Sequence, residues 1–172
     1  MELELHPHRW ERRAPDWQAA AVSGLAAGAV LMVLELFWAA TMHTAGPWRI
    51  PHMVAAIVMG SDLVMAQSFA FSVGVVAVAL LTHYVLGIAF GLLLGFIIAG
   101  FHYEASAGMM QVFGVGFGVA LYVLNFYGMS QFFPWFAELR GWSTLIAHLV
   151  FGITASLLYW KLARPGADSQ RS

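Results

Sequence analysis

The sequence predicts an all-α membrane protein, organised as a four-helix transmembrane bundle. Of its 172 residues, 60% are hydrophobic and only 10% are charged, and four apolar runs are long enough to cross a bilayer. Soluble domains contain about 25% charged residues, so most of this surface is expected to contact the lipid bilayer. Because lipid cannot hydrogen-bond to the backbone, the spanning segments are expected to be helices. The length suits one integral membrane domain, residues 1–172.

The four predicted spans follow the apolar runs of about 20 residues or more that a bilayer-crossing helix requires. They lie at about 17–43, 69–100, 108–128 and 143–163. The segment 47–68, between the first two spans, is too apolar for a solvated loop and too short and interrupted for a span. We therefore expect an interfacial or re-entrant segment on the outer face of the membrane.

Lysine and arginine residues predict the orientation of the chain. Most of them lie in or next to the two terminal tails: Arg9, Arg12, Arg13, Lys161, Arg164 and Arg171. Only Arg49 and Arg140 lie in the connections on the opposite side. Since positively charged residues are retained on the cytoplasmic side of a membrane, both termini of this multi-pass protein are expected in the cytoplasm.

Composition excludes several classes of partner and cofactor. The net charge of −1 gives no reason to expect binding to nucleic acid. The sequence has no cysteine, which excludes disulfides, thiolate metal sites and iron–sulfur clusters. No P-loop, GxGxxG or GxSxG motif is present, so a non-enzymatic role is favoured. The expected partner is the lipid bilayer, with a homo-oligomer or a larger membrane complex as a further possibility.

The two halves of the chain resemble each other, which suggests an internal repeat. Residues 24–35 (GLAAGAVLMVLE) match residues 114–125 (GVGFGVALYVLN), and residues 83–88 (HYVLGI) match residues 148–153 (HLVFGI). Both halves begin on the same predicted side, so they would be parallel helical-hairpin repeats. The alternative is two similar glycine-rich hairpins without a common origin.

Small residues recur along the predicted spans with the spacing of one helix face. Such stripes mark the faces on which membrane helices approach closely. The candidate packing residues are Gly24, Gly28, Gly87, Gly114, Gly118 and Gly152.

One polar residue in each predicted span lies on these same faces, and the four form a candidate buried polar or ion site, the polar quartet. Its members are Glu35, His83, Asn125 and His148. Glu35 is the only charged residue at membrane depth, and an ionisable group there is costly and is by default a candidate functional group.

The quartet is compatible with several roles that the sequence leaves open. Its side chains could form interhelical hydrogen bonds that fix the bundle. Alternatively, Glu35 could be the proton or cation site of a transport-related or membrane-complex component. In that case the outer segment, with His43, His52 and Asp62, could act as a gate.

A further alternative is a redox subunit that binds a metal ion or haem. His83, His148 and Glu35 are suitable ligands for a divalent metal. His83 and His148 could also be the two axial ligands of haem b, as in electron-transfer cytochromes. No catalytic residue is predicted in either case.

The segment PWRIPHMVAAIVMG (residues 47–60), followed by THYVLGI (residues 82–88), resembles a group of short bacterial four-span membrane proteins. Members of this group often carry the label sodium:proline symporter or have no assigned activity. The resemblance covers the chain from about Asp16 to Leu162. It implies a bacterial inner-membrane protein and, through the label, a role in transport, but it assigns a role to no individual residue.

Overall fold

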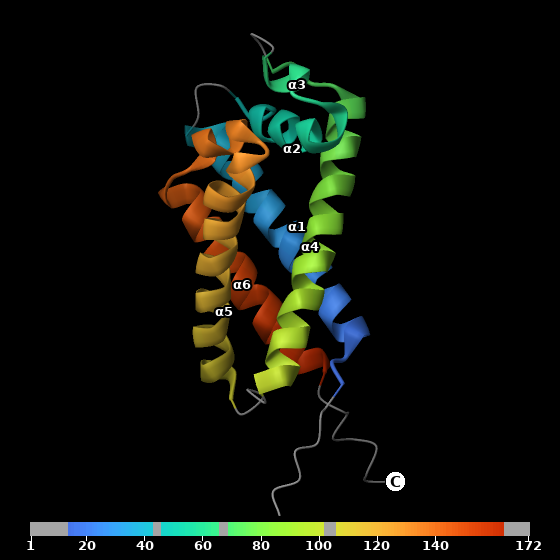
Figure 1. Ribbon diagram of the computed structural model, residues 1–172, viewed down its shortest axis with the longest axis vertical. Helices are drawn as coiled ribbons and strands as arrows, with labels where there is room; N and C mark the ends of the chain where they lie inside the picture. The colour runs from blue at the N-terminus through green and yellow to red at the C-terminus, as the bar shows by residue number, and fades with distance from the viewer. Residues whose placement is uncertain (1–13, 43–45, 66–68, 102–105, 164–172) are drawn as a thin grey trace, which may run out of the picture.

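The structure, a computed structural model, describes residues 14–42, 46–65, 69–101 and 106–163, and these residues form helices and no strand (Figure 1). The long helices are α1 (Trp17–Met42), α4 (Val73–Phe101), α5 (Ala107–Val123) and α6 (Trp142–Leu162). Two short helices, α2 (Arg49–Met59) and α3 (Asp62–Met65), lie between α1 and α4. The connection from α5 to α6 contains η1 (Leu124–Gly128), η2 (Met129–Gln131) and η3 (Pro134–Leu139).

Four helical stretches are long and apolar enough to cross a membrane, which confirms the predicted fold class. They are Trp17–Thr41, Val73–Gly100, Ala107–Gln131 and Trp142–Leu162. The second begins later than predicted, because Ser72 precedes the helix and its Oγ accepts a hydrogen bond from the backbone N–H of Val75 at 3.5 Å. The third runs past residue 128, because the helical backbone continues through η1 and η2.

The long helices pack in the spatial order α4, α1, α6, α5. The extensive contacts are those of α1 with α4, of α1 with α6, and of α5 with α6. In Figure 1, α4 and α5 stand apart while α1 and α6 cross behind them. α1 begins and α6 ends at the same end of the bundle, as an even number of spans requires. The cytoplasmic location of that end stays a prediction, since most of the basic tail residues lie outside the described residues.

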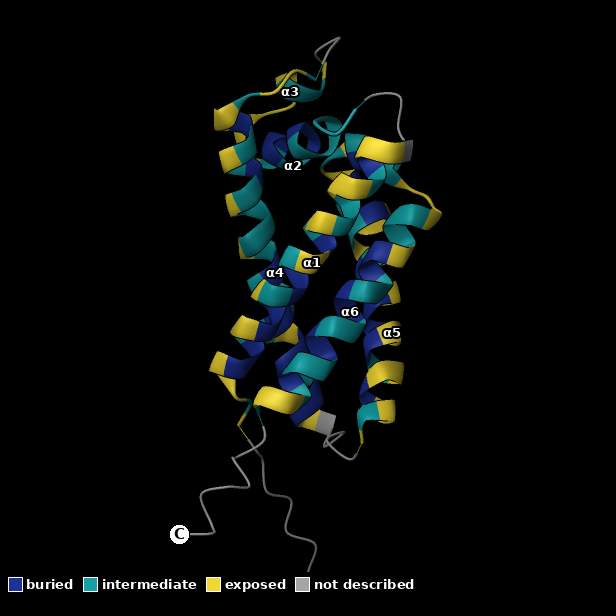
Figure 2. Cartoon of the chain, turned by 180° about the vertical axis from the view of Figure 1, so that it is seen from behind, coloured by how far each residue is buried: buried dark blue, intermediate teal, exposed yellow. Residues whose placement is uncertain are grey.

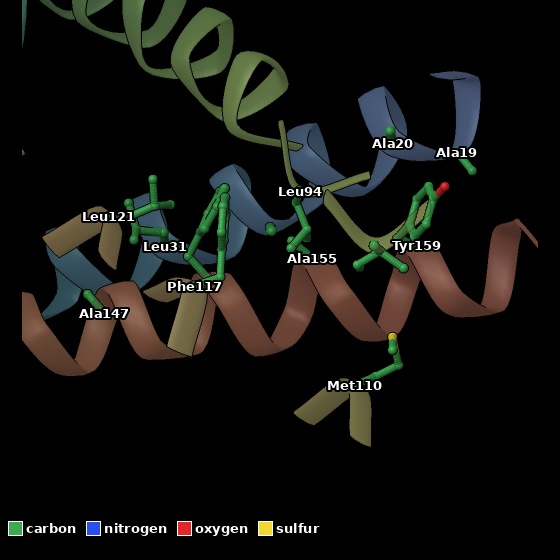
Figure 3. Packing of buried hydrophobic residues seen from close by; sticks show 13 residues of the cluster. Ala19, Ala20, Leu31, Leu94, Met110, Phe117, Leu121, Ala147, Ala155 and Tyr159 are labelled. Carbon is green, nitrogen blue, oxygen red and sulfur yellow. The ribbon is translucent and has the colours of Figure 1, made fainter. Parts of the chain in front are cut away.

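A packed apolar core runs along the bundle from the end where α1 begins, at Ala19, to the level of Leu31 and Ala147 (Figure 3). All four long helices contribute to it, including Ala20 of α1, Leu94 of α4, Phe117 of α5 and Tyr159 of α6. Large apolar side chains remain exposed on the outward faces of the helices (Figure 2). An apolar outer face on each long helix is the arrangement expected for contact with lipid.

Glycines bring the helix backbones into contact in both hairpins. A Cβ atom on Gly24 of α1 would lie 2.8 Å from Cα of Gly91 on α4. A Cβ atom on Gly114 of α5 would lie 2.6 Å from the carbonyl oxygen of Gly152 on α6. Gly91 lies on the packing face of the second span, four residues after Gly87, and it occupies the position in the first hairpin that Ser156 occupies in the second.

The other predicted packing glycines differ in how tightly they are enclosed. A Cβ atom on Gly118 would lie 2.9 Å from backbone atoms of α6, and one on Gly87 would lie 3.0 Å from the carbonyl oxygen of Gly24. Gly28 is different, because a Cβ atom there would be 3.7 Å from its nearest neighbour, an ordinary van der Waals distance. Gly28 faces the partner helix but leaves room for a methyl group.

The predicted outer segment contains α2 and α3, which lie across the end of the bundle away from the termini (Figure 1). α2 packs against α4 through a small apolar cluster of Ala55 with Val75 and Ala79. It is also tied to η3, because Trp135 Nε1 donates a hydrogen bond to the carbonyl oxygen of Met53 at 3.0 Å. An ion pair between Arg49 and Glu138 joins the same two elements. The segment therefore covers one end of the bundle.

Candidate polar site in the bundle

The polar quartet converges on one cavity inside the bundle, which we call the central cavity. Glu35 comes from α1, His83 from α4, Asn125 from η1 and His148 from α6, and all four line this cavity of about 90 Å³. The remaining lining is mostly apolar, with side chains such as Phe90, Phe136 and Phe151. Since a cavity needs only about 10–15 Å³ to hold a water molecule, this space can hold several.

His148 has hydrogen-bond partners at both ring nitrogens. Its Nδ1 lies 2.8 Å from the carbonyl oxygen of Thr144, which can only accept, so Nδ1 carries the proton. Its Nε2 therefore accepts a hydrogen bond from the side-chain amide Nδ2 of Asn125, at 3.2 Å. The imidazole is buried and its ring also contacts Phe126 edge to face. These contacts hold His148 in its neutral form and connect α6 to η1.

Asn125 lies in a π-helical turn, which the sequence analysis did not predict. The backbone N–H of Met129 donates to the carbonyl oxygen of Leu124, five residues earlier. π-helical turns inside α-helices occur frequently at functional sites. Nothing in the hydrophobic periodicity separates this turn from an α-helical one, and a nearby Gly128 is the only sequence signal.

Arg140 holds the end of this turn. Its Nε donates to the carbonyl oxygen of Phe126 at 2.7 Å, and its Nη2 donates to Oγ of Ser130 at 3.0 Å. The guanidinium carbon also lies 4.3 Å from the centre of the Tyr127 ring, a cation–π contact. The sequence analysis used Arg140 only for orientation. In the structure it binds a helix carbonyl next to the polar site, where a cation also suits the helix dipole.

His83 connects α4 to α1. Its Nε2 lies 2.9 Å from the carbonyl oxygen of Gly28, so Nε2 carries the proton and donates. Nδ1 of the same ring is then an acceptor, and among the described residues it has no hydrogen-bond partner. His83, like His148, therefore forms an interhelical hydrogen bond as a neutral imidazole.

Glu35 differs from the other three members of the quartet. Its carboxylate has no hydrogen bond or ion pair with any described residue. It is also the one quartet member that lines two further cavities besides the central one. It is the only acidic residue within the four spans.

The first of these additional cavities, the polar cavity, lies between α1, η3 and α6 and has a volume of about 170 Å³. Its lining includes Arg49, Glu138, Arg140 and Thr144, so it joins Glu35 to the charged residues at the α2 end of the bundle. Both arginines are already paired, Arg49 with Glu138 and Arg140 with the turn described above. Neither arginine forms an ion pair with Glu35.

The second, the lateral cavity, lies between α1, α2 and α4 and has a volume of about 320 Å³. Glu35 and His83 are its only ionisable lining residues, and the rest of its wall is almost entirely apolar. Glu35 therefore stands where a polar, a central and an apolar cavity meet.

The described side chains do not form a preassembled metal site, and metal or haem binding by the quartet stays a prediction. Among the described residues, no group of three or more His, Cys, Asp or Glu side chains is placed to hold a metal ion, although His83, His148 and Glu35 are all described. The central cavity of about 90 Å³ is also well below the roughly 300–1,000 Å³ of cofactor and ligand pockets. Nε2 of each histidine takes part in a hydrogen bond.

Of the predicted gate residues, the two that the structure describes line none of these three cavities. His43 lies outside the described residues. His52 is buried beside Phe69, with Nδ1 2.8 Å from the carbonyl oxygen of Trp48. Asp62 is exposed on α3. Arg49, Glu138 and Trp135 connect α2 to η3 at this end of the bundle, and no sequence pattern indicated Glu138.

In comparisons with known proteins, no family model matches this chain, and no curated protein and no solved structure shows significant similarity to it. The function proposed below therefore rests on the geometry of the polar site.

Proposed function

We propose that this chain is a transport-related membrane protein in which Glu35 is the proton- or cation-binding group. The observation that carries the proposal is the position of Glu35, an acid within a span that has no partner among the described residues and lines all three cavities. A carboxylate in this environment is stabilised either by a proton or by a bound cation. Intramembrane acids of this kind mark ion and proton pathways in other membrane proteins.

The polar cavity supplies a route for the ion. It extends from the Arg49–Glu138 ion pair at the α2 end to Glu35. On the opposite side of Glu35, the packed core of apolar side chains separates the site from the end where the chain begins. These features favour a site that exchanges ions with the α2 end, while passage to the other end requires the core to open.

The other quartet members have a different role in this proposal. His83, Asn125 and His148 form interhelical hydrogen bonds that fix the walls of the central cavity. They shape the space next to Glu35 but do not carry the ion. Interhelical hydrogen bonds in membranes contribute about 0.6 kcal/mol on average, which suits such a positioning role.

The proposal is tested by ion flux into proteoliposomes. A membrane potential is imposed, and uptake of protons and, separately, of sodium ions is measured for the wild type and for Glu35→Gln. Glu35→Gln keeps the size of the side chain but can neither release a proton nor pair with a cation. We expect the variant to reduce flux to the level of protein-free vesicles.

Asp62→Asn is the matched control, because Asp62 is an exposed acid outside the three cavities and its neutralisation should leave flux unchanged. Flux of both ions that is absent in the wild type, or that survives in Glu35→Gln, contradicts the proposal.

A further inference from the structure

The lateral cavity has the size and the wall of a small-molecule site. Its volume of about 320 Å³ falls within the roughly 300–1,000 Å³ of typical ligand pockets. Met32 and Leu36 of α1 face Val76 and Leu80 of α4 across it. Leu36 is 40% exposed, so the cavity borders the outer surface of the bundle. A ligand that enters here arrives through an apolar environment.

The two ionisable side chains that line this cavity, Glu35 and His83, offer hydrogen-bond acceptors. The Glu35 carboxylate has no partner among the described residues. Nδ1 of His83 is an acceptor, because Nε2 of that ring donates to Gly28. The lining of this cavity contains no lysine or arginine. The ligand group that matches Glu35 and His83 is therefore a cationic donor.

Two aromatic rings also border the cavity. The Trp48 and Phe71 rings pack together with their centroids 4.8 Å apart. Aromatic rings attract cations and also provide apolar contact area. Their position next to a single unpaired acid suits a molecule that is both hydrophobic and positively charged.

From these contacts we propose that the lateral cavity binds a hydrophobic monocation, with its ammonium group paired to Glu35 and its apolar part between α1, α2 and α4. This inference rests on the proposed function in taking Glu35 as the ion-binding residue, and it adds the class of substrate. A phospholipid ammonium group is a poorer fit, because its phosphate would place a second negative charge near Glu35 without a free cation to balance it.

Binding is tested by equilibrium dialysis of radiolabelled octylammonium against the purified protein in detergent micelles, with protein-free micelles as the blank. The neutral comparison is 2-octanone, which has a similar length but only accepts hydrogen bonds. We expect saturable binding of the amine, with binding of the ketone at least about tenfold weaker. Glu35→Gln should weaken amine binding by about 30-fold or more, because it removes one partner of a desolvated charge pair.

Two phenylalanine variants test the location of the site. Val76→Phe narrows the lateral cavity and should weaken amine binding while Glu35 is intact. Leu81→Phe lies on the same helix, where residue 81 is 67% exposed and lines none of the three cavities, and should bind like the wild type. Glu35→Gln is close to isosteric, so it remains informative if Val76→Phe fails to fold.

The outcomes separate this inference from the proposed function. Flux that depends on Glu35, without amine binding by the wild type, refutes the monocation site and leaves the proposed function intact. Amine binding that depends on Glu35, without any ion flux, supports the site and refutes the transport role. Amine binding that survives in Glu35→Gln overturns the inference, as does displacement of octylammonium by equimolar phosphatidylethanolamine, which would give the site to a lipid head group.

Discussion

The contact between α5 and α6 at Gly118 connects helix packing to the polar site, and Gly118→Ala tests that connection. A Cβ atom on Gly118 would meet the carbonyl oxygen of His148 most closely, and it would also lie 2.9 Å from the carbonyl carbon of His148 and 2.9 Å from Cα of Leu149. Carbon atoms in contact prefer about 3.5–4.0 Å, so the helices must separate by roughly 0.6–1 Å. The hydrogen bond from Asn125 to His148, now 3.2 Å, then exceeds the length of a real hydrogen bond.

The size of the effect follows from the atoms that the new methyl group meets. They are backbone atoms, which cannot rotate away, and overpacking of this kind costs about 1–3 kcal/mol. Alanine also gains up to about 1 kcal/mol over glycine in a helix. Gly116→Ala on the same helix gains the same helix propensity, and its Cβ atom would meet no atom within 4 Å. A comparison of the two variants therefore removes the propensity contribution and leaves the cost of the close contact. The two variants should differ by about 1–3 kcal/mol, with Gly118→Ala the less stable.

Thermal unfolding in one detergent measures the difference. For a chain of this size, 1 kcal/mol corresponds to about 2–4 °C in Tm, so Gly118→Ala is expected to unfold roughly 2–12 °C below Gly116→Ala. The ¹⁵N resonances of His148 should also shift in Gly118→Ala and stay unchanged in Gly116→Ala. Equal Tm values for the two variants would refute the close contact between α5 and α6.

Three other substitutions test the contacts around the site. Asn125→Leu removes the donor to His148 and should reduce the free energy of unfolding by about 0.6–1.7 kcal/mol, measured by thermal unfolding. Arg140→Ala removes the hydrogen bonds and the cation–π contact that hold η1, and because Arg140 is exposed we expect a loss of about 1 kcal/mol. Trp135→Phe removes the hydrogen bond to α2, and hydrogen exchange of the α2 amides should increase.

Each of these three substitutions is paired with a control variant or with a result that would contradict the expected effect. Asn125→Gln retains the amide donor but places it one methylene group further from the backbone. Any decrease in the free energy of unfolding of this variant therefore reports the position of the donor and not its absence. Arg140→Lys retains the charge but not the forked guanidinium, and it should restore less than half of the lost stability. For Trp135→Phe, the contradicting result is unchanged hydrogen exchange of the α2 amides together with faster exchange in α6. That result would show that the Trp135 hydrogen bond does not stabilise the contact between η3 and α2.

The location of the spans and the faces on which the helices pack could be predicted from the sequence, because both depend on local patterns. Hydropathy over about 20 residues identifies a span, and the spacing of Gly24, Gly114 and Gly118 identifies a packing face. The even number of spans also places the two chain ends together. Glu35 could be singled out because an acid within an apolar run needs no tertiary information to be noticed.

The difference between Glu35 and the other three members of the quartet depended on the tertiary structure. The sequence groups Glu35 with His83, Asn125 and His148, since each is the polar residue on a packing face. In the structure the last three form interhelical hydrogen bonds, while Glu35 forms none with the residues that the structure describes. Hydrogen-bond partners depend on the relative rotation of neighbouring helices, and a rotation of one residue, about 100°, changes every pair.

The sequence by itself therefore determined that this chain is a helical membrane protein with one intramembrane acid, because the cost of burying polar groups in lipid acts on each segment separately. Only the tertiary structure decided that Glu35 lies where three cavities meet and that a π-helical turn held by Arg140 presents Asn125 to His148. These features arise where side chains from distant segments meet, and no local pattern in the sequence encodes the space that is left between them.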